Sequence, residues 1–122
     1  MTIADLQLYH YRLPLTEPLP VGDRILTERR GLLVRLTDEK GREGWGEAAP
    51  LPGFSPETVD EATTQARDLQ GDLPGLRLPD AALDVILRAV PAADWGPSVR
   101  FAVESAVVEL VAAVRGASVA QV

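Results

Sequence analysis

The N-terminal part of the chain predicts one long strand followed by one long loop. Residues 3–15 are rich in Leu and Tyr and alternate roughly between apolar and polar side chains, as in a strand with one buried face. Pro14 marks the end of this strand, because proline lacks the N–H group that a strand ladder uses. Residues 16–30 contain two prolines and Gly22, which break regular structure. A connection of this length inside a small domain is usually functional or mobile.

A β-hairpin is expected next. Residues 31–37 and 42–48 both have strand composition, and the residues between them end in Gly41, which can adopt the positive φ of a tight turn. A Pro-rich loop, residues 49–54, then leads to the sequence Ser-Pro-Glu that begins at Ser55. Serine caps free N–H groups, proline suits the first helical position, and an acid complements the positive helix end. The pattern therefore predicts a helix from Ser55.

The expected helix from Ser55 is amphipathic and should lie on the sheet, because its apolar residues recur at helical spacing. These residues are Val59, Ala62, Ala66 and Leu69. After a Gly/Pro-rich break, Asp80 is expected to cap a shorter helix that ends at Pro91. The order of elements predicts an α+β fold, with a three-stranded antiparallel meander followed by a small set of helices.

The last expected helix, from Ser98 to about Arg115 with Gly116 as its C-cap, is apolar on nearly all sides. Its valines occupy positions 99, 103, 107, 108, 111 and 114. Three strands and two short helices offer too little surface to bury such a helix, so we expect an exposed apolar face on it. The sequence reaches Val122 without a polar tail, and we expect it to continue into a part that these residues do not contain.

Composition narrows the class of protein. A length of 122 residues suits one domain, and 46% apolar with 25% charged residues is typical of a globular one. A net charge of −6 without a Lys/Arg cluster argues against nucleic acid as a partner. No segment approaches the ~20 apolar residues of a membrane span. Since the chain also has no cysteine and its first residues do not resemble a signal peptide, we expect a cytoplasmic domain without a membrane partner.

Residues able to transfer protons or bind metal ions are few. His10 is the only histidine and lies in the middle of the first strand, where a structural role is favoured. Lys40, the only lysine, lies in the hairpin turn and is a poor base. The acids are scattered, without the spacing that places several oxygens on one cation. Glu47 lies next to the Pro-rich loop, where accepting loop N–H groups is favoured over direct chemistry. We therefore expect no catalytic and no metal-binding residue in this chain.

One continuous run carries a family resemblance. GWGEAAPLPGFSPET, residues 44–58, resembles the end of the hairpin in the capping domain of the enolase superfamily and, more narrowly, the o-succinylbenzoate synthase family. Three further segments agree in order: QLYHYRLPL (7–15) with the first strand, RRGLLVRL (29–36) with the second, and PSVRFAVESAVVEL (97–110) with the helix toward the barrel. The resemblance covers nearly the whole chain.

The resemblance implies a two-part, Mg²⁺-dependent lyase of menaquinone biosynthesis. Residues 1–115 would be the capping domain, and residues 116–122 the start of a linker to a (β/α) barrel that is missing from this chain. In that family, barrel lysines move protons and three barrel carboxylates bind Mg²⁺, so neither catalytic residues nor metal ligands are expected here. The implied partners are a small-molecule carboxylate substrate and the missing barrel, and the chain alone is expected to be inactive.

The cap of this family contributes two loops that close over the substrate. The resemblance places them around residues 18–30 and at Leu51, Pro52, Gly53, Phe54 and Ser55. In the first loop, Arg24 or Arg29 is expected to bind a substrate carboxylate, with an ordinary surface arginine as the alternative. In the second, Phe54 would form an apolar wall or, alternatively, pack the loop onto the first helix.

Two other functions stay open from the sequence. The cap of a dipeptide epimerase or an N-acylamino acid racemase would have the same fold, because the residues that distinguish these enzymes lie in the barrel. A non-enzymatic interaction domain is the alternative from another class of protein.

Overall fold

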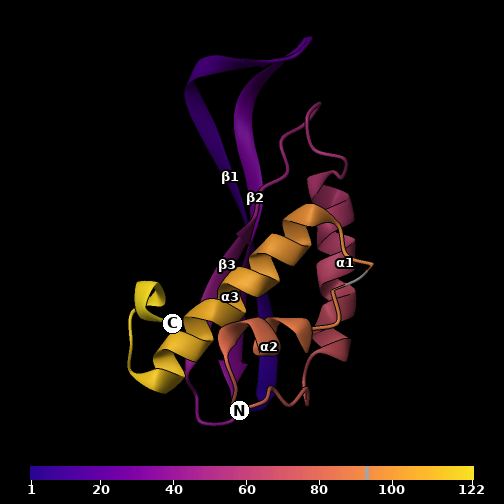
Figure 1. The fold of residues 1–122 in the computed structure, drawn as a ribbon. Helices are drawn as coiled ribbons and strands as arrows, with labels where there is room; N and C mark the ends of the chain where they lie inside the picture. Colours follow the sequence, from indigo (N-terminus) through magenta and orange to yellow (C-terminus); the bar gives the residue numbers. More distant parts are fainter. Residues whose placement is uncertain (93) are drawn as a thin grey trace.

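The computed structural model describes residues 1–92 and 94–122 and has an antiparallel sheet with helices packed against it (Figure 1). The strand order is β1-β2-β3, which confirms the predicted α+β meander. The elements are β1 (Ile3–Val21), β2 (Arg24–Asp38), β3 (Glu43–Ala48), α1 (Val59–Asp72), α2 (Leu83–Arg88), α3 (Pro97–Arg115) and the 3-10 helix η1 (Val119–Gln121).

Strands β1 and β2 form a much longer hairpin than the sequence predicted. The loop expected at residues 16–30 is wrong, because β1 continues to Val21 and β2 begins at Arg24. Gly22, with a φ of 60°, forms the turn between them. The prolines are tolerated because β1 is an edge strand whose pairing with β2 is interrupted between Pro14 and Leu19.

Helix α1 begins after Thr58, and the start predicted at Ser55 is wrong. The Thr58 hydroxyl accepts a hydrogen bond from the Glu61 N–H at 3.1 Å, and the Glu61 carboxylate accepts one from the Thr58 N–H at 3.2 Å. This reciprocal capping box outcompetes the Ser-Pro-Glu signal. Ser55 instead closes the preceding loop, where its hydroxyl accepts the Leu51 N–H at 2.8 Å.

The other helix ends follow the sequence in part. Asp80 does not cap α2, whose N-cap is Ala82 without a side-chain hydrogen bond. Helix α3 has the predicted extent, and Gly116 ends it in the left-handed conformation with a φ of 61°.

Helix α3 is largely buried, so the apolar face predicted to be exposed on it is wrong for most of its valines. Val99, Val103, Val107 and Val111 are buried, and only Val108 and Val114 are partly exposed. In the sheet, the buried residues opposite this helix include Leu32, Val34 and Leu36 of β2. The sheet and the helices of this chain therefore provide one continuous core.

Two glycines of β3 explain how α3 becomes buried. A Cβ at Gly46 would overlap the carbonyl oxygen of Ala102, and a Cβ at Gly44 would overlap that of Ala106. The helix backbone therefore lies directly on the strand, closer than any side chain at these two positions would allow. The small side chains of Ala102 and Ala106 make the same approach possible from the helix side.

Side chains from the neighbouring segment cap the N-terminus of α3. Gly96, its N-cap residue, has no side chain for this purpose. Its N–H donates to the Gln65 side-chain oxygen at 2.8 Å, and the Ser98 N–H donates to the Glu57 carboxylate at 3.3 Å. Glu57 thus satisfies the start of α3 and not, as its sequence position suggested, the start of α1. These bonds join both α1 and the segment before it to the start of α3.

The close contact between β3 and α3 predicts a strong effect of one methyl group. Gly46→Ala should lower the free energy of unfolding by roughly 3 kcal/mol, because the strand and the helix must separate to accommodate the new Cβ. Gly71→Ala is the matched control: Gly71 lies in α1 with open space around it, so alanine should raise the free energy of unfolding by about 0.5–1 kcal/mol. Urea unfolding of both variants checks this, and equal midpoints would contradict it.

Candidate functional site

The end of the β1–β2 hairpin and the loop of residues 49–58 rise side by side beyond the helices (Figure 1). They enclose a groove of about 690 Å³. Strand β2 lines one wall from Arg24 to Arg30, and the loop lines the other, with the first residues of α1 at the base. Because the hairpin is longer than predicted, the first wall is a strand and not a flexible loop.

Five of the seven residues predicted for the site line this groove. These are Arg24, Arg29, Pro52, Gly53 and Ser55. Leu51 lies in the loop turn, where its carbonyl oxygen accepts the N–H groups of Phe54 at 3.0 Å and Ser55 at 2.8 Å. Residues from both predicted segments thus line one groove, although the sequence did not predict the strand that carries the arginines.

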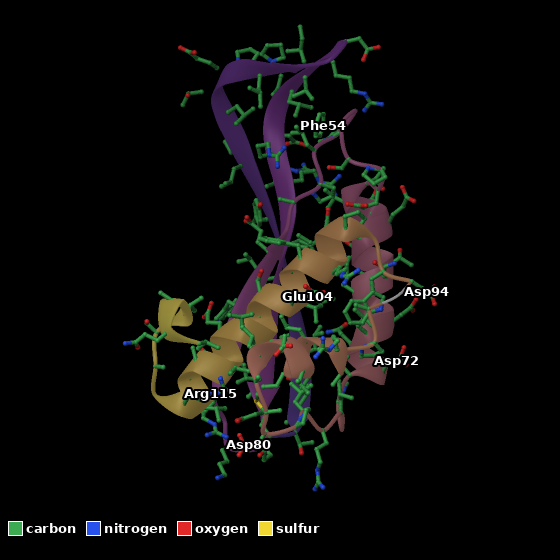
Figure 2. All side chains as sticks on the ribbon, viewed as in Figure 1. Phe54, Asp72, Asp80, Asp94, Glu104 and Arg115 are labelled. Carbon is green, nitrogen blue, oxygen red and sulfur yellow. The ribbon has the colours of Figure 1, made fainter. Side chains whose placement is uncertain are left out.

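Phe54 is 81% exposed. The alternative in which its ring packs the loop onto the first helix is therefore wrong. Figure 2 shows Phe54 beside the projecting hairpin, at the end of the molecule opposite to Asp80 and Arg115. An aromatic ring held in water at this place is available for a surface or ligand that approaches the groove end.

Arg24 and Gly53 bring the two walls of the groove into contact. Gly53 has a φ of 81°, and a Cβ built on it would lie 3.1 Å from the Arg24 Cδ, so the Arg24 stem passes across the glycine. Within residues 1–92 and 94–122, no hydrogen bond or ion pair engages the Arg24 guanidinium. It is therefore a cation with free donors at the rim of the groove.

Arg29 lies in a second cluster, formed with Tyr11 and Glu47. The Arg29 Nη2 donates to the Ala49 carbonyl oxygen at 3.2 Å, at the point where the loop leaves β3. Burial, together with the hydrogen bond to the Glu47 carboxylate, raises the pKa of Tyr11 to about 12. Within residues 1–92 and 94–122, no loop N–H donates to the Glu47 carboxylate as predicted, and this carboxylate lies beside the Tyr11 phenol instead. The Tyr11 ring covers Gly31, where a Cβ would overlap it.

His10 has the structural role that the sequence favoured. Its Nε2 lies 2.9 Å from the Thr63 hydroxyl, which itself donates to the Val59 carbonyl oxygen at 2.8 Å. Because that hydroxyl proton is already used, the His10 Nε2–H must be the donor in this pair. The contact joins β1 to α1.

Two properties of the described residues bear on possible partners. In the chain apart from residue 93, no three histidine or acidic side chains gather as a metal-binding group would require. No helix in that part of the chain is long and apolar enough to cross a membrane.

Comparison with known proteins gives the class of protein first. Solved enolase-superfamily enzymes share the fold, among them a dipeptide epimerase from Cytophaga hutchinsonii, with a TM-score of 0.78, 26% identity and coverage of 92% of this chain and 30% of that one. The o-succinylbenzoate synthase of Thermosynechococcus elongatus has a TM-score of 0.51 and 37% identity over 75% of this chain and 27% of its own. The fold is that of the enolase N-terminal capping domain.

The family follows from the sequence match. Residues 3–110 match the family model described as MenC, N-terminal domain, and the chain belongs to this family. The o-succinylbenzoate synthase of Citrobacter koseri is 41% identical over 96 residues, which cover 75% of this chain and 30% of the relative. That of Haemophilus influenzae is 48% identical over 66 residues, 54% of this chain and 20% of the relative. The matches thus span between a fifth and a third of these relatives' length.

The raised pKa of Tyr11 predicts how stability depends on pH. The phenol remains protonated in the folded chain up to about pH 12, whereas it ionises from about pH 10 in the unfolded chain. The stabilisation that the protonated Tyr11 phenol gives the folded chain is therefore fully present below about pH 10 and is lost as the pH rises to about 12. Between these values, urea unfolding should show a steeper loss of stability in the wild type than in Tyr11→Phe. Parallel curves for the two proteins would show that Glu47 and burial do not affect this phenol.

Proposed function

We propose that this chain is the capping domain of an o-succinylbenzoate synthase. The longer enzyme would dehydrate 2-succinyl-6-hydroxy-2,4-cyclohexadiene-1-carboxylate to o-succinylbenzoate in menaquinone biosynthesis. Residues 1–115 would form the cap, and residues 116–122, which include Gly116 and η1, would begin the linker to the barrel. The chain by itself would have no activity, and its task would be to cover the substrate.

The exposed apolar side chains at one end of the molecule carry this proposal. Four large ones lie along the β1–β2 hairpin and on the adjacent loop: Leu13 (57% exposed), Leu19 (42%), Ile25 (70%) and Phe54 (81%). Apolar groups that gather on two neighbouring projecting segments are typical of a surface that is covered in the working protein. A cap that closes on a substrate would bury them and exclude water from the reaction.

Arg24 is the better candidate of the two arginines for the substrate carboxylate. Its guanidinium lies at the groove rim without a partner among the described residues, whereas Arg29 already donates to Ala49. A free guanidinium can bind a carboxylate through two parallel hydrogen bonds, which fixes the orientation of the ligand as well as its position.

Magnesium would be bound outside this chain. The solved Thermosynechococcus elongatus synthase is described as complexed with Mg in its active site. The described residues here do not fit such an ion, because they bring no three acids or histidines together. In the proposed enzyme the barrel would hold the ion, and this chain would only shape the space around the substrate.

A dipeptide epimerase is the second candidate, because the Cytophaga hutchinsonii epimerase has a TM-score of 0.78 to this fold, against 0.51 for the Thermosynechococcus elongatus synthase. Identity favours the synthase: 41% to 48% with the synthases from Citrobacter koseri and Haemophilus influenzae, against 26% with the epimerase. Similarity of fold is shared across the superfamily, so the higher identity supports the synthase.

A chimera tests the proposed function. Residues 3–110 would replace the matching segment of the Citrobacter koseri synthase, and the chimera should form o-succinylbenzoate at a rate within about tenfold of the parent. The control is the same synthase carrying the cap of the Bacillus subtilis epimerase, which should be at least about a hundredfold slower because its cover fits another substrate. A folded but inactive chimera beside an active control would contradict the proposal.

Phe54 can be tested in the active chimera. Phe54→Ala should lower kcat/KM by roughly tenfold, about 1.4 kcal/mol of transition-state stabilisation, by removing the apolar wall. The unfolding temperature should hardly change, because the ring is exposed. Phe101→Ala, at the other exposed phenylalanine, on α3, is the matched control and should leave kcat/KM unchanged. Equal losses in the two variants would remove Phe54 from the substrate cover.

A further inference from the structure

We propose that Arg29 is a positioning residue that fastens the loop of residues 49–58 to the long hairpin, so that the two segments move as one body. The importance of this coupling for catalysis rests on the proposed function. The coupling itself is a physical property of this chain and can be measured without substrate.

The hairpin end has little other support. Pairing between β1 and β2 is irregular between Pro14 and Leu19, which separates the end of the hairpin from the regular part of the sheet. Beyond this irregularity Leu19 and Ile25 are exposed, and Figure 1 shows the hairpin extending past both α1 and α3. Its direction relative to the core therefore depends on what it contacts at its side.

The loop has a fixed internal shape. The Leu51 carbonyl oxygen accepts the N–H groups of Phe54 and Ser55, and the Leu51 N–H donates to the Ser55 hydroxyl. Because these bonds close the turn on itself, the loop can tilt as a unit when its attachments change. Its attachments to the hairpin, together with the bond of Glu57 to the start of α3, then decide where Phe54 is held.

Two arginines of β2, Arg29 and Arg24, attach the loop, and a third, Arg30, attaches the helix that follows it. Arg29 holds the beginning of the loop through Ala49, the Arg24 stem lies across Gly53 near its tip, and Arg30 pairs with Asp60 just beyond its end at 3.4 Å. Consecutive strand residues point to opposite faces, so Arg29 reaches the loop from one face of the sheet and Arg30 reaches α1 from the other. The loop is thus held near its start by Arg29 and near its tip by Arg24.

Arg29 is the strongest of these attachments. The Arg30–Asp60 pair is solvent-exposed, with side chains 39% and 85% accessible, and such pairs contribute little. The Arg24 contact is made by its apolar stem alone. Arg29 makes a partly buried hydrogen bond to the backbone, and its charge lies close enough to the Tyr11–Glu47 pair to influence the Tyr11 pKa. Arg29 pairs with Leu13 in the regular part of the sheet, so its bond fixes the loop to the base of the hairpin, and the Arg24 contact with Gly53 passes that position on to the hairpin end. Loss of the Arg29 bond should therefore free the loop and, through Arg24 and Gly53, the hairpin end as well.

Hydrogen exchange of the 122-residue chain tests this coupling. Arg29→Met keeps the stem but removes the donor, and it should raise exchange at least about fivefold at the amides of Phe54 and Ser55 and also at residues 19–26. Arg29→Lys keeps a donor and should return the rates to within about twofold of wild type. Arg12→Met is the control: it removes an exposed pair with Glu28 on the same hairpin and should change neither segment.

Gly53→Ala provides the reverse experiment and remains informative if Arg29→Met fails to fold. A Cβ at this position strains the loop and displaces Arg24, so exchange at residues 19–26 should rise although the substitution is in the loop. The proposal is overturned if Arg29→Met raises exchange at only one of the two segments, or if Gly53→Ala raises it in the loop alone. It is also overturned if Arg12→Met has the effect of Arg29→Met. Because no substrate is used, failure here leaves the proposed covering role standing, and an inactive chimera would leave this coupling intact.

Discussion

The contact between the β3 glycines and α3 is the constraint on which the rest of the structure depends. Because Gly44 and Gly46 have no side chains, the helix backbone rests on the strand at Ala102 and Ala106. This short distance lets a helix rich in valine bury its apolar face against only three strands. It also fixes the N-terminus of α3 where Glu57 and Gln65 can cap it, which ties the end of the candidate loop and helix α1 to the core.

A core closed in this way leaves two segments outside it. The hairpin beyond Pro14 and the loop of residues 49–58 carry exposed apolar side chains and free polar groups that the fold does not use. A packed core that carries two projecting segments with exposed side chains is the arrangement expected of a domain that covers the substrate site of another domain. The arginines of β2 give the two segments a common orientation, which a cover made of two independent loops would lack.

The sequence was sufficient at several positions where a local signal acted alone, although the capping signal of Asp80 failed. Gly41 marked the second hairpin, Gly116 marked the end of α3, and the run at residues 44–58 identified the family. The prediction from sequence was wrong where two signals competed. Prolines suggested a loop at residues 16–30, although an edge strand accommodates them. Burial of α3 required knowing that glycines 44 and 46 face the helix, and no one-dimensional pattern contains that pairing. The partners of Arg24 and Arg29 were beyond prediction for the same reason.

The covering role itself is tested most directly by hydrogen exchange of the synthase chimera with and without bound o-succinylbenzoate. If the hairpin end and the loop close over the ligand, binding should slow exchange at residues 19–26 and 51–55 by at least about tenfold and leave α2, at the opposite end of the cap, unchanged. Binding of the ligand without protection of either segment would contradict the account.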